Sequence, residues 1–411
     1  MAERGHCRVC PEIPFIRPRA AGRGITLASI STFDEDIIPF QVEVSQAQLR
    51  DLRQRLSQTR WPAQISGTGW ARGVPGEYLR ELAEYWAQRF DWQAWEKRLN
   101  SYPQYVTVID GARIHFLHIR SHRTGATPMI MLHGWPGSVL EFLDVIEPLS
   151  DPEDGSPAFD LIIPSHPNFG FSGPTTDSGW DSIRTARAYA ELMRRLGYPR
   201  YAVQGGDYGA FIGPDLGRID ADRVLGVHVN AATWGFMPHG QVPDDDAATL
   251  TELEREKLTL IGEFLTDGSG YYQIQGTRPH TLGFALADSP AGQLAWIVEK
   301  FHAWTGSRGA LEDRVDRDHM LADVSIYWFT NTGSSSAQMY YESLHSPQHP
   351  THSRVPTGVA NFAGDPAIRR YAEQLNNIVR WTEFDTGGHF AAMQTPDLLV
   401  SDIRAFFAGL R

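Results

Sequence analysis

A glycine-rich turn carries the residue with the clearest chemical potential. Residues 205–209 read Gly-Gly-Asp-Tyr-Gly, and they stand between an apolar stretch at 201–203 and a helical stretch. Small residues around Asp207 permit the sharp strand–turn–helix conformation called a nucleophile elbow, where esterases carry a serine. A carboxylate there can displace a group from saturated carbon and form an alkyl ester, which water can hydrolyse at the carboxyl carbon. Taken alone, a glycine-rich turn with an aspartate is common and is more often structural.

A second segment could supply backbone donors for that reaction. Residues 133–138 read His-Gly-Trp-Pro-Gly-Ser and directly follow the apolar stretch 129–132. Next to a nucleophile elbow, an N–H from this loop pairs with the N–H of the residue after the nucleophile to form an oxyanion hole. We therefore predict that the N–H groups of Trp135 and Tyr208 are the oxyanion donors. By itself the segment could equally be a Gly/Pro turn.

His389 and Asp365 complete a candidate triad. His389 stands in a Gly-Gly-His-Phe segment after the last strand-like stretch, which is where such folds place the base. Asp365 lies in the loop after the preceding strand-like stretch, in the place of the acid. The chain order Asp207, Asp365, His389 matches nucleophile, acid and base. One of 15 histidines proves little alone, but four weak signals in the right order favour a catalytic site over four unrelated turns.

The elements that must position these residues alternate between strands and helices. Strand-like stretches occur at 113–119, 129–132, 161–163, 201–203, 224–227, 355–358 and 378–381, with helix-sized segments between most of them. This alternation predicts an α/β fold, the α/β-hydrolase fold, with a mostly parallel central sheet flanked by helices. Helical stretches dominate between residues 232 and 350, which predicts a helical cap inserted in the core.

The expected organisation has five parts. They are a flexible tail (1–36), an N-terminal region with a helical extension (37–110), the first part of the core (111–231), the cap (232–350) and the second part of the core (351–411). Ser45 is a plausible N-cap for the first helix of the extension. Cys7 and Cys10 form a C-x-x-C pair in the tail. Because no second pair exists, we interpret them as tail thiols and not as a metal or redox site.

Composition restricts the class of protein. The chain has 411 residues, of which 42% are hydrophobic, and a formal net charge of −12. An acidic protein disfavours nucleic acid and anionic membranes as partners. Two cysteines exclude a disulfide framework. Since no stretch approaches the roughly 20 apolar residues that span a bilayer, and no secretory signal is evident, we expect a cytoplasmic protein without a membrane anchor. A homodimer is compatible with the sequence.

These motifs resemble those of the microsomal-type epoxide hydrolases, a family that includes insect juvenile hormone epoxide hydrolases and soluble bacterial and fungal members. The resemblance covers nearly the whole chain after about residue 38. Residues 55–62 resemble the N-terminal domain peculiar to this family, 163–172 its loop after a core strand, and 269–279 its cap. The family often has glutamate where Asp365 stands. The resemblance implies conversion of an epoxide and water to a vicinal diol, with no metal or organic cofactor.

The resemblance also assigns two tyrosines of the cap. Tyr271, in a Ser-Gly-Tyr segment, matches the first, and Tyr341, in Gln-Met-Tyr-Tyr, matches the second. Each has a tyrosine beside it, Tyr272 and Tyr340. Opening an epoxide develops an alkoxide, and a phenol of pKa about 10 can donate a hydrogen bond or a proton to it.

The mechanism implied by the resemblance has two steps. Asp207 attacks an epoxide carbon and forms a hydroxyalkyl ester. His389, oriented by Asp365, then activates a water that hydrolyses the ester, while the N–H groups of Trp135 and Tyr208 stabilise the oxyanion.

Two alternatives use the same scaffold. A haloalkane or haloacid dehalogenase also has an aspartate elbow, but it commonly needs a tryptophan after the nucleophile, where this chain has Tyr208. A non-catalytic ligand-binding protein would normally lack one catalytic position, and all are filled here. The 12 Trp, 14 Tyr and 20 Phe make an aromatic-lined pocket for a hydrophobic or aromatic epoxide plausible. Detoxification and a step in secondary metabolism both remain open.

Overall fold

A nine-stranded sheet forms the centre of the protein. The structure, a computed structural model, describes residues 36–238, 240, 242, 244–307, 309–348 and 350–410. The tail up to residue 35, with Cys7 and Cys10, lies outside these residues. The strands are β1 (Ile38–Phe40), β2 (Gln104–Ile109), β3 (Ala112–Ile119), β4 (Thr127–Leu132), β5 (Phe159–Pro164), β6 (Tyr201–Gly206), β7 (Val224–Asn230), β8 (Pro356–Asn361) and β9 (Asn377–Glu383).

The sheet is mostly parallel, as the sequence predicts. Its strand order is β1-β2-β3-β5-β4-β6-β7-β8-β9. Strands β5, β4, β6, β7, β8 and β9 run parallel, whereas β1, β2 and β3 pair antiparallel at one edge. All six residues of β6 are buried, and this explains why the central strands read as short apolar runs without alternation. Strands β1 and β2 were not anticipated, and they join the N-terminal region to the sheet.

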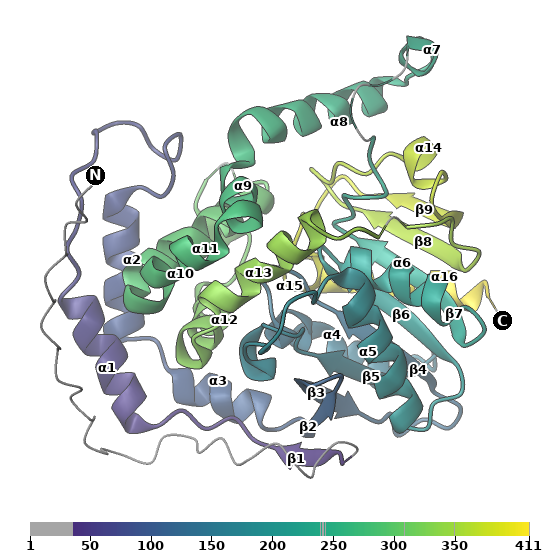
Figure 1. Cartoon of the computed structure of the whole chain (residues 1–411), viewed down its shortest axis with the longest axis horizontal. Coiled ribbons are helices and arrows are strands. Elements are labelled where there is room, and N and C mark those ends of the chain that lie inside the picture. Colours follow the sequence, from purple (N-terminus) through teal and green to yellow (C-terminus); the bar gives the residue numbers. More distant parts are fainter. Residues whose placement is uncertain are drawn as a thin grey trace, which may run out of the picture. The chain divides into compact units, whose positions relative to one another are not determined.

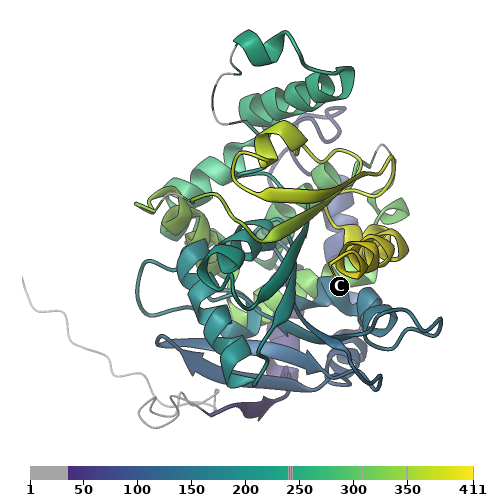
Figure 2. The ribbon, with the colours of Figure 1, turned by 90° about the vertical axis from the view of Figure 1, so that its right-hand side faces the viewer.

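Helices cover both faces of the sheet. Helices α5 and α6 pack together on one face, and α4 and α16 pack together on the other (Figure 2). The helical elements of the core are η1 (Val139–Phe142), α4 (Leu143–Ser150), η2 (Gly170–Ser172), α5 (Ser182–Arg195), α6 (Gly209–Ile219), α14 (Arg369–Ala372), α15 (Ala391–Gln394) and α16 (Pro396–Ala408). Because parallel strands end at the same edge, the loops after β4, β6, β8 and β9 bring the predicted site residues together.

A helical insertion separates β7 from β8 (Figure 1). Within the described residues it consists of α7 (Asp244–Ala247), α8 (Glu252–Glu263), the π-helical turn η3 (Phe264–Gly268), α9 (Gly270–Thr277), α10 (Pro279–Asp288), α11 (Pro290–Trp304), η4 (Leu311–Asp313), α12 (Arg317–Thr330) and α13 (Gly333–Leu344). We call these elements the cap. Before the core stand α1 (Gln46–Ser57), α2 (Gly76–Gln88) and α3 (Trp92–Leu99). Ser45 caps α1 in a capping box with Gln48, which confirms the predicted N-cap.

Polar bonds tie the cap to its surroundings on two sides. On one side, α2 contributes the indole of Trp86, which donates to the Ser325 hydroxyl of α12 over 2.9 Å in a buried setting. On the other, the buried Lys257 of α8 forms an ion pair with Glu383 of β9, with a separation of 2.7 Å. The cap is therefore attached both to the N-terminal helices and to the far end of the sheet. No helix among the described residues is both long enough and apolar enough to cross a membrane.

Candidate active site

Asp207 lies in a sharp turn between β6 and α6. Its backbone φ is +53°, a left-handed conformation that is uncommon for a residue other than glycine. The glycines on either side leave no room for a side chain. A Cβ on Gly205 would overlap the carbonyl of Gly209, and a Cβ on Gly209 would overlap the carbonyl of Leu132. This is the geometry of a nucleophile elbow, which the sequence predicts, and it lifts the carboxylate to the edge of the sheet.

The loop after β4 offers a backbone donor to this carboxylate. The N–H of Trp135 donates to Asp207 Oδ1 over 2.9 Å. The backbone N–H of Tyr208 acts on the same carboxylate, since both N–H groups lower the pKa of Asp207. Gly134 has no room for a Cβ, which would meet the side chain of Asp207. Trp135 and Tyr208 thus stand where the sequence predicts the two oxyanion donors.

A buried histidine network holds that loop in place. Nε2 of His166 lies 2.6 Å from the carbonyl of His133, which requires that this nitrogen carries the proton. Nδ1 of His166 then accepts from the hydroxyl of Tyr189 over 2.7 Å. The carbonyl of His133 also accepts from the N–H of Gly209, at the start of α6, over 3.1 Å. The oxyanion loop and the elbow are therefore joined directly through one carbonyl group.

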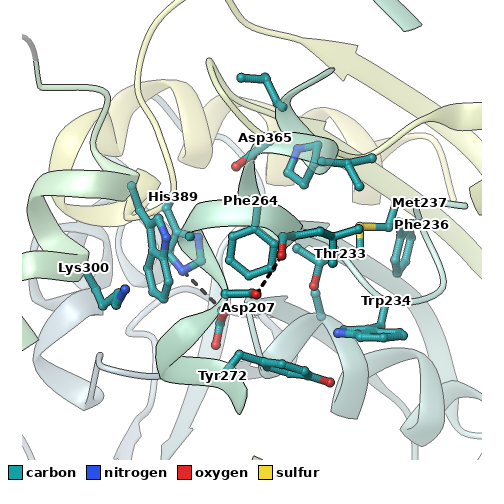
Figure 3. Close-up of a pocket in the computed structure, with 18 of the residues that line it drawn as sticks. Asp207, Thr233, Trp234, Phe236, Met237, Phe264, Tyr272, Lys300, Asp365 and His389 are labelled. Atoms are coloured by element: carbon teal, nitrogen blue, oxygen red, sulfur yellow. Dashed lines mark hydrogen bonds and ion pairs between the residues drawn. The ribbon is translucent and has the colours of Figure 1, made fainter. Parts of the chain in front are cut away.

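His389 faces the other oxygen of Asp207. Its Nε2 lies 3.5 Å from Asp207 Oδ2, and both side chains keep a little exposure, 15% and 17%, on the side of the cavity (Figure 3). Trp304 of the cap holds His389 in place. The backbone N–H of His389 donates to the backbone carbonyl of Trp304 over 3.1 Å, and the centroids of the imidazole and indole rings lie 4.7 Å apart. A histidine beside the carboxylate could activate a water that attacks the carboxyl carbon.

Asp365 lies in the loop after β8, close to the site (Figure 3). Its Oδ2 accepts from the N–H of Phe362 over 2.9 Å and from the N–H of Ala231 over 3.3 Å. Among the residues that the structure describes, no hydrogen bond joins Asp365 to His389. The acid is present beside the site, and its role in orienting His389 stays a prediction.

Burial sets the charges of the reacting pair. It raises the pKa of Asp207 to about 6, against the opposing effect of the N–H groups of Trp135 and Tyr208. It lowers the pKa of His389 to about 3. At neutral pH the aspartate is thus mainly a carboxylate and the histidine is neutral. These are the forms that a nucleophile and a general base require.

The raised pKa of Asp207 predicts an acid limb in the pH profile. If Asp207 is the nucleophile, kcat/KM should fall about tenfold per pH unit below about pH 6, because a protonated carboxyl cannot attack, and it should level off above that pH. His389 stays neutral throughout this range. The measurement is initial rate against pH, with circular dichroism at each pH as the control for folding. A limb centred near pH 4, the usual range of an aspartate, would contradict the effect of burial.

Two buried phenols of the cap stand over Asp207. Tyr271 of α9 stacks on the indole of Trp135, with ring centroids 5.3 Å apart and planes 9° apart. Tyr340 of α13 meets the rings of Trp135 and Tyr271 edge-on, each at 5.9 Å. Burial raises the pKa of both phenols well above 10, and the negative charge of Asp207 raises it further. Both therefore keep their protons and can serve as hydrogen-bond donors.

Tyr341, which the resemblance assigns to the site, does not face the cavity. It is 38% exposed and stacks on His345, one turn further along α13. Its neighbour Tyr340 is 4% exposed and lines the cavity together with Tyr271. Adjacent residues on a helix point about 100° apart, and on α13 the direction toward the cavity is that of Tyr340. The structure therefore places Tyr340, and not the predicted Tyr341, in the wall of the cavity.

The cavity over Asp207 is large, with a volume of ≈ 2960 Å³. Its wall includes residues that the sequence analysis did not single out: Lys300 and Trp304 of α11, and Trp70–Gly73 between α1 and α2. For Tyr340 a signal existed. Gly333, Ser336 and Ala337 fall on the same helical face, and this run of small residues marks the buried side of α13.

Comparisons with known proteins agree with this geometry. Residues 37–142 match the family model "Epoxide hydrolase N terminus", and residues 127–267 match the model "alpha/beta hydrolase fold". Epoxide hydrolase 1 of Sus scrofa is 34% identical over 413 residues, which covers 92% of this chain and 90% of that one.

Solved structures are similar as well. The juvenile hormone epoxide hydrolase of the silkworm Bombyx mori has a TM-score of 0.83 at 31% identity, covering 93% of this chain and 96% of that chain. The Aspergillus niger epoxide hydrolase has a TM-score of 0.80 at 32% identity, covering 93% and 98%. The α/β-hydrolase fold, the aspartate elbow and these similarities together show that the chain belongs to the epoxide hydrolase family and is an epoxide hydrolase.

Proposed function

We propose that the enzyme opens epoxides with the carboxylate of Asp207 and releases vicinal diols through a covalent ester. One observation supports this most directly. The two oxygens of Asp207 have different neighbours: Oδ1 accepts the N–H of Trp135, and Oδ2 lies 3.5 Å from Nε2 of His389. Oδ1 is therefore suited to become the carbonyl oxygen of an ester, and Oδ2 is suited to form the new bond to carbon.

In the first step, Oδ2 of Asp207 attacks one epoxide carbon. The carbon–oxygen bond of the ring breaks, and its electron pair moves to the epoxide oxygen. The phenols of Tyr271 and Tyr340 donate to that oxygen, and one of them supplies the proton that makes it a hydroxyl group. Their position over Asp207 places donors on the side of the leaving oxygen, where charge develops.

In the second step, His389 takes a proton from a water molecule, and the resulting hydroxide attacks the carboxyl carbon of Asp207. Negative charge then develops on Oδ1, where the N–H groups of Trp135 and Tyr208 stabilise it. Collapse of this intermediate expels the diol oxygen, which takes the proton of the newly added hydroxyl group, so that the diol is released and the carboxylate is restored. The proton on His389 then returns to the phenolate that the first step left behind. Asp365 would orient His389 in this step and stabilise the charged form of its imidazole ring.

Oxygen-18 water tests the covalent step. A single turnover with enzyme in excess should place one heavy oxygen in Asp207 and none in the diol, because the diol oxygen comes from the old carboxylate. Mass spectrometry of the peptide that contains Asp207 and of the diol measures both. Label that enters the diol directly in the first turnover would show attack of water on the epoxide and would contradict the ester.

We further propose that the substrate is a hydrophobic epoxide with an aromatic or extended apolar group. Aromatic and apolar side chains surround Asp207 in the cavity, among them Trp234, Phe264 and Tyr272 (Figure 3). Apolar walls favour apolar ligands because binding removes both surfaces from water. A styrene-type epoxide should have a much higher kcat/KM than a short polar epoxide of equal ring reactivity. Equal values for the two would contradict this substrate class.

A further inference from the structure

A buried lysine lies in the wall of the active-site cavity. Lys300 of α11 is 5% exposed, although a lysine is almost never fully buried unless it is paired. Its Nζ stands 4.3 Å from the ring centroid of Tyr271 and 5.8 Å from that of Trp304. It forms an ion pair with the neighbouring Glu299, whose side chain is 33% exposed. The two-step mechanism gives this ammonium group no part.

The rings that Lys300 contacts are the rings that hold the reacting groups. Tyr271 stacks on Trp135, which supplies an oxyanion donor, and Trp304 packs against His389. Trp304 also meets Tyr271 edge-on at 5.4 Å. A cation over an aromatic face is attracted by the ring, and more strongly where water is excluded. Lys300 is thus placed to fix Tyr271 and to act electrostatically on its phenol.

In the proposed first step, negative charge moves from Asp207 onto groups that include the Tyr271 phenol, whose ring lies beside Lys300. Before the reaction the charge is on Asp207, and afterwards it has moved to the epoxide oxygen and the phenol that donates to it. A fixed cation beside the phenol favours the second arrangement over the first, and a fixed cation needs no reorganisation during the step. The carboxylate of Glu299 has the opposite effect, since it raises the pKa of Tyr271.

We propose that Lys300 is a positioning residue for ring opening, which holds the Tyr271 ring against Trp135 and stabilises the negative charge that develops at the phenol and the epoxide oxygen. Lys300 forms no bond to the substrate. The proposal rests on the proposed ester mechanism, and it concerns only the first step. Hydrolysis of the ester, in which charge develops on Oδ1 of Asp207, should depend on Lys300 much less.

The first step can be measured alone in a His389→Gln background, where the ester should accumulate because the base is missing. Rapid quenching and intact-protein mass spectrometry follow the ester with time at several concentrations of a styrene-type epoxide. Adding Lys300→Met should lower the limiting rate about tenfold, the effect of roughly 1.4 kcal/mol. The half-saturating concentration should stay unchanged, because Lys300 acts on the transition state and not on binding of the epoxide.

Two further variants separate this role from a structural one. Lys300→Arg keeps the charge and should restore most of the rate. Lys257→Met is the matched control, because Lys257 is also a buried cap lysine in an ion pair, but with Glu383 and away from Tyr271. It should leave the rate of ester formation unchanged. Thermal melting of each variant shows whether it is folded.

The outcomes are distinct. An unchanged limiting rate in Lys300→Met, no rescue by arginine, or an equal loss in Lys257→Met would overturn the role of Lys300. If the His389→Gln protein with Lys300 intact forms no ester at all, the ester mechanism itself fails. A rise in half-saturating concentration with no change in rate would show that Lys300 only shapes the cavity, which also contradicts the proposal.

Discussion

Replacing Asp207 with asparagine should abolish diol formation. The amide has nearly the shape of the carboxylate, and its oxygen can still accept the N–H of Trp135, so the elbow should be retained. The amide is nevertheless a poor nucleophile, and loss of an activated nucleophile typically lowers kcat by about 10⁴-fold or more. The measurement is diol release by chromatography, with Ser57→Ala on the exposed face of α1 as a control that should keep full activity.

The same substitution should raise the stability of the protein at neutral pH. Burial raises the pKa of Asp207 to about 6, from an ordinary value of 3.8 for an aspartate, so the folded state disfavours the charged form relative to the unfolded state. At 1.36 kcal/mol per pKa unit, the charge costs about 2–3 kcal/mol of unfolding free energy at neutral pH. This cost begins as the pH rises above about 4, and it is fully present above about 6. Asparagine removes it.

Thermal melting of both proteins across this pH range checks the sign. The Tm of Asp207→Asn should exceed that of the parent protein at pH 8, and the two should converge near pH 4, where both side chains are neutral. A variant that is less stable at pH 8 would mean that the carboxylate contributes more through its hydrogen bonds than it costs by burial. Retained turnover would contradict Asp207 as the nucleophile.

Tyr340→Phe should slow ester formation about 100-fold, whereas Tyr341→Phe should leave it unchanged. Removing one preformed donor from a developing oxyanion typically costs about 10²–10³ in rate. Tyr340 is buried beside Trp135 and Tyr271, but Tyr341 is on the outer side of α13 against His345. The pair is well matched, since both changes remove one hydroxyl group from adjacent positions of the same helix.

The ester assay in the His389→Gln background measures this step, and Tyr271→Phe should have an effect similar to that of Tyr340→Phe. The double substitution Tyr271→Phe and Tyr340→Phe should cost more than either change alone, because neither of the two proposed donors then remains. A large loss with Tyr341→Phe and none with Tyr340→Phe would contradict the position of α13 in the structure.

The core of the site was predictable because its residues sit on strand ends. Asp207 follows a short apolar strand and has glycines on both sides, and each of these features is visible locally in the sequence. Trp135 and His389 likewise follow strand-like stretches. The topology of a parallel sheet gathers such positions at one edge, so chain order was enough to group them. Strand β1 was missed because it has only three residues, too few to show a period.

The cap was less predictable because helices there pack on several sides. Tyr340 and Tyr341 differ by one step of about 100°, and choosing between them requires knowing which face of α13 meets the core. Lys300 gave no signal in the sequence. A lysine in a helix is normally exposed. Only the fold shows that the ammonium group of Lys300 lies beside two rings, that of Tyr271, which is distant in sequence, and that of Trp304, which is one helical turn away.

The two attachments of the cap, to α2 and to β9, determine how substrate can enter the cavity and how product can leave it. Lifting the cap as one lid would separate Trp86 from Ser325 and Lys257 from Glu383, and each break would leave a buried polar group unpaired. We therefore expect epoxides to enter and diols to leave through an opening that is present without any movement of the cap and is bordered by the exposed residues Ala71 and Arg72. The width of that opening, and not a hinge motion of the cap, would then limit the size of the epoxide that can enter and of the diol that can leave.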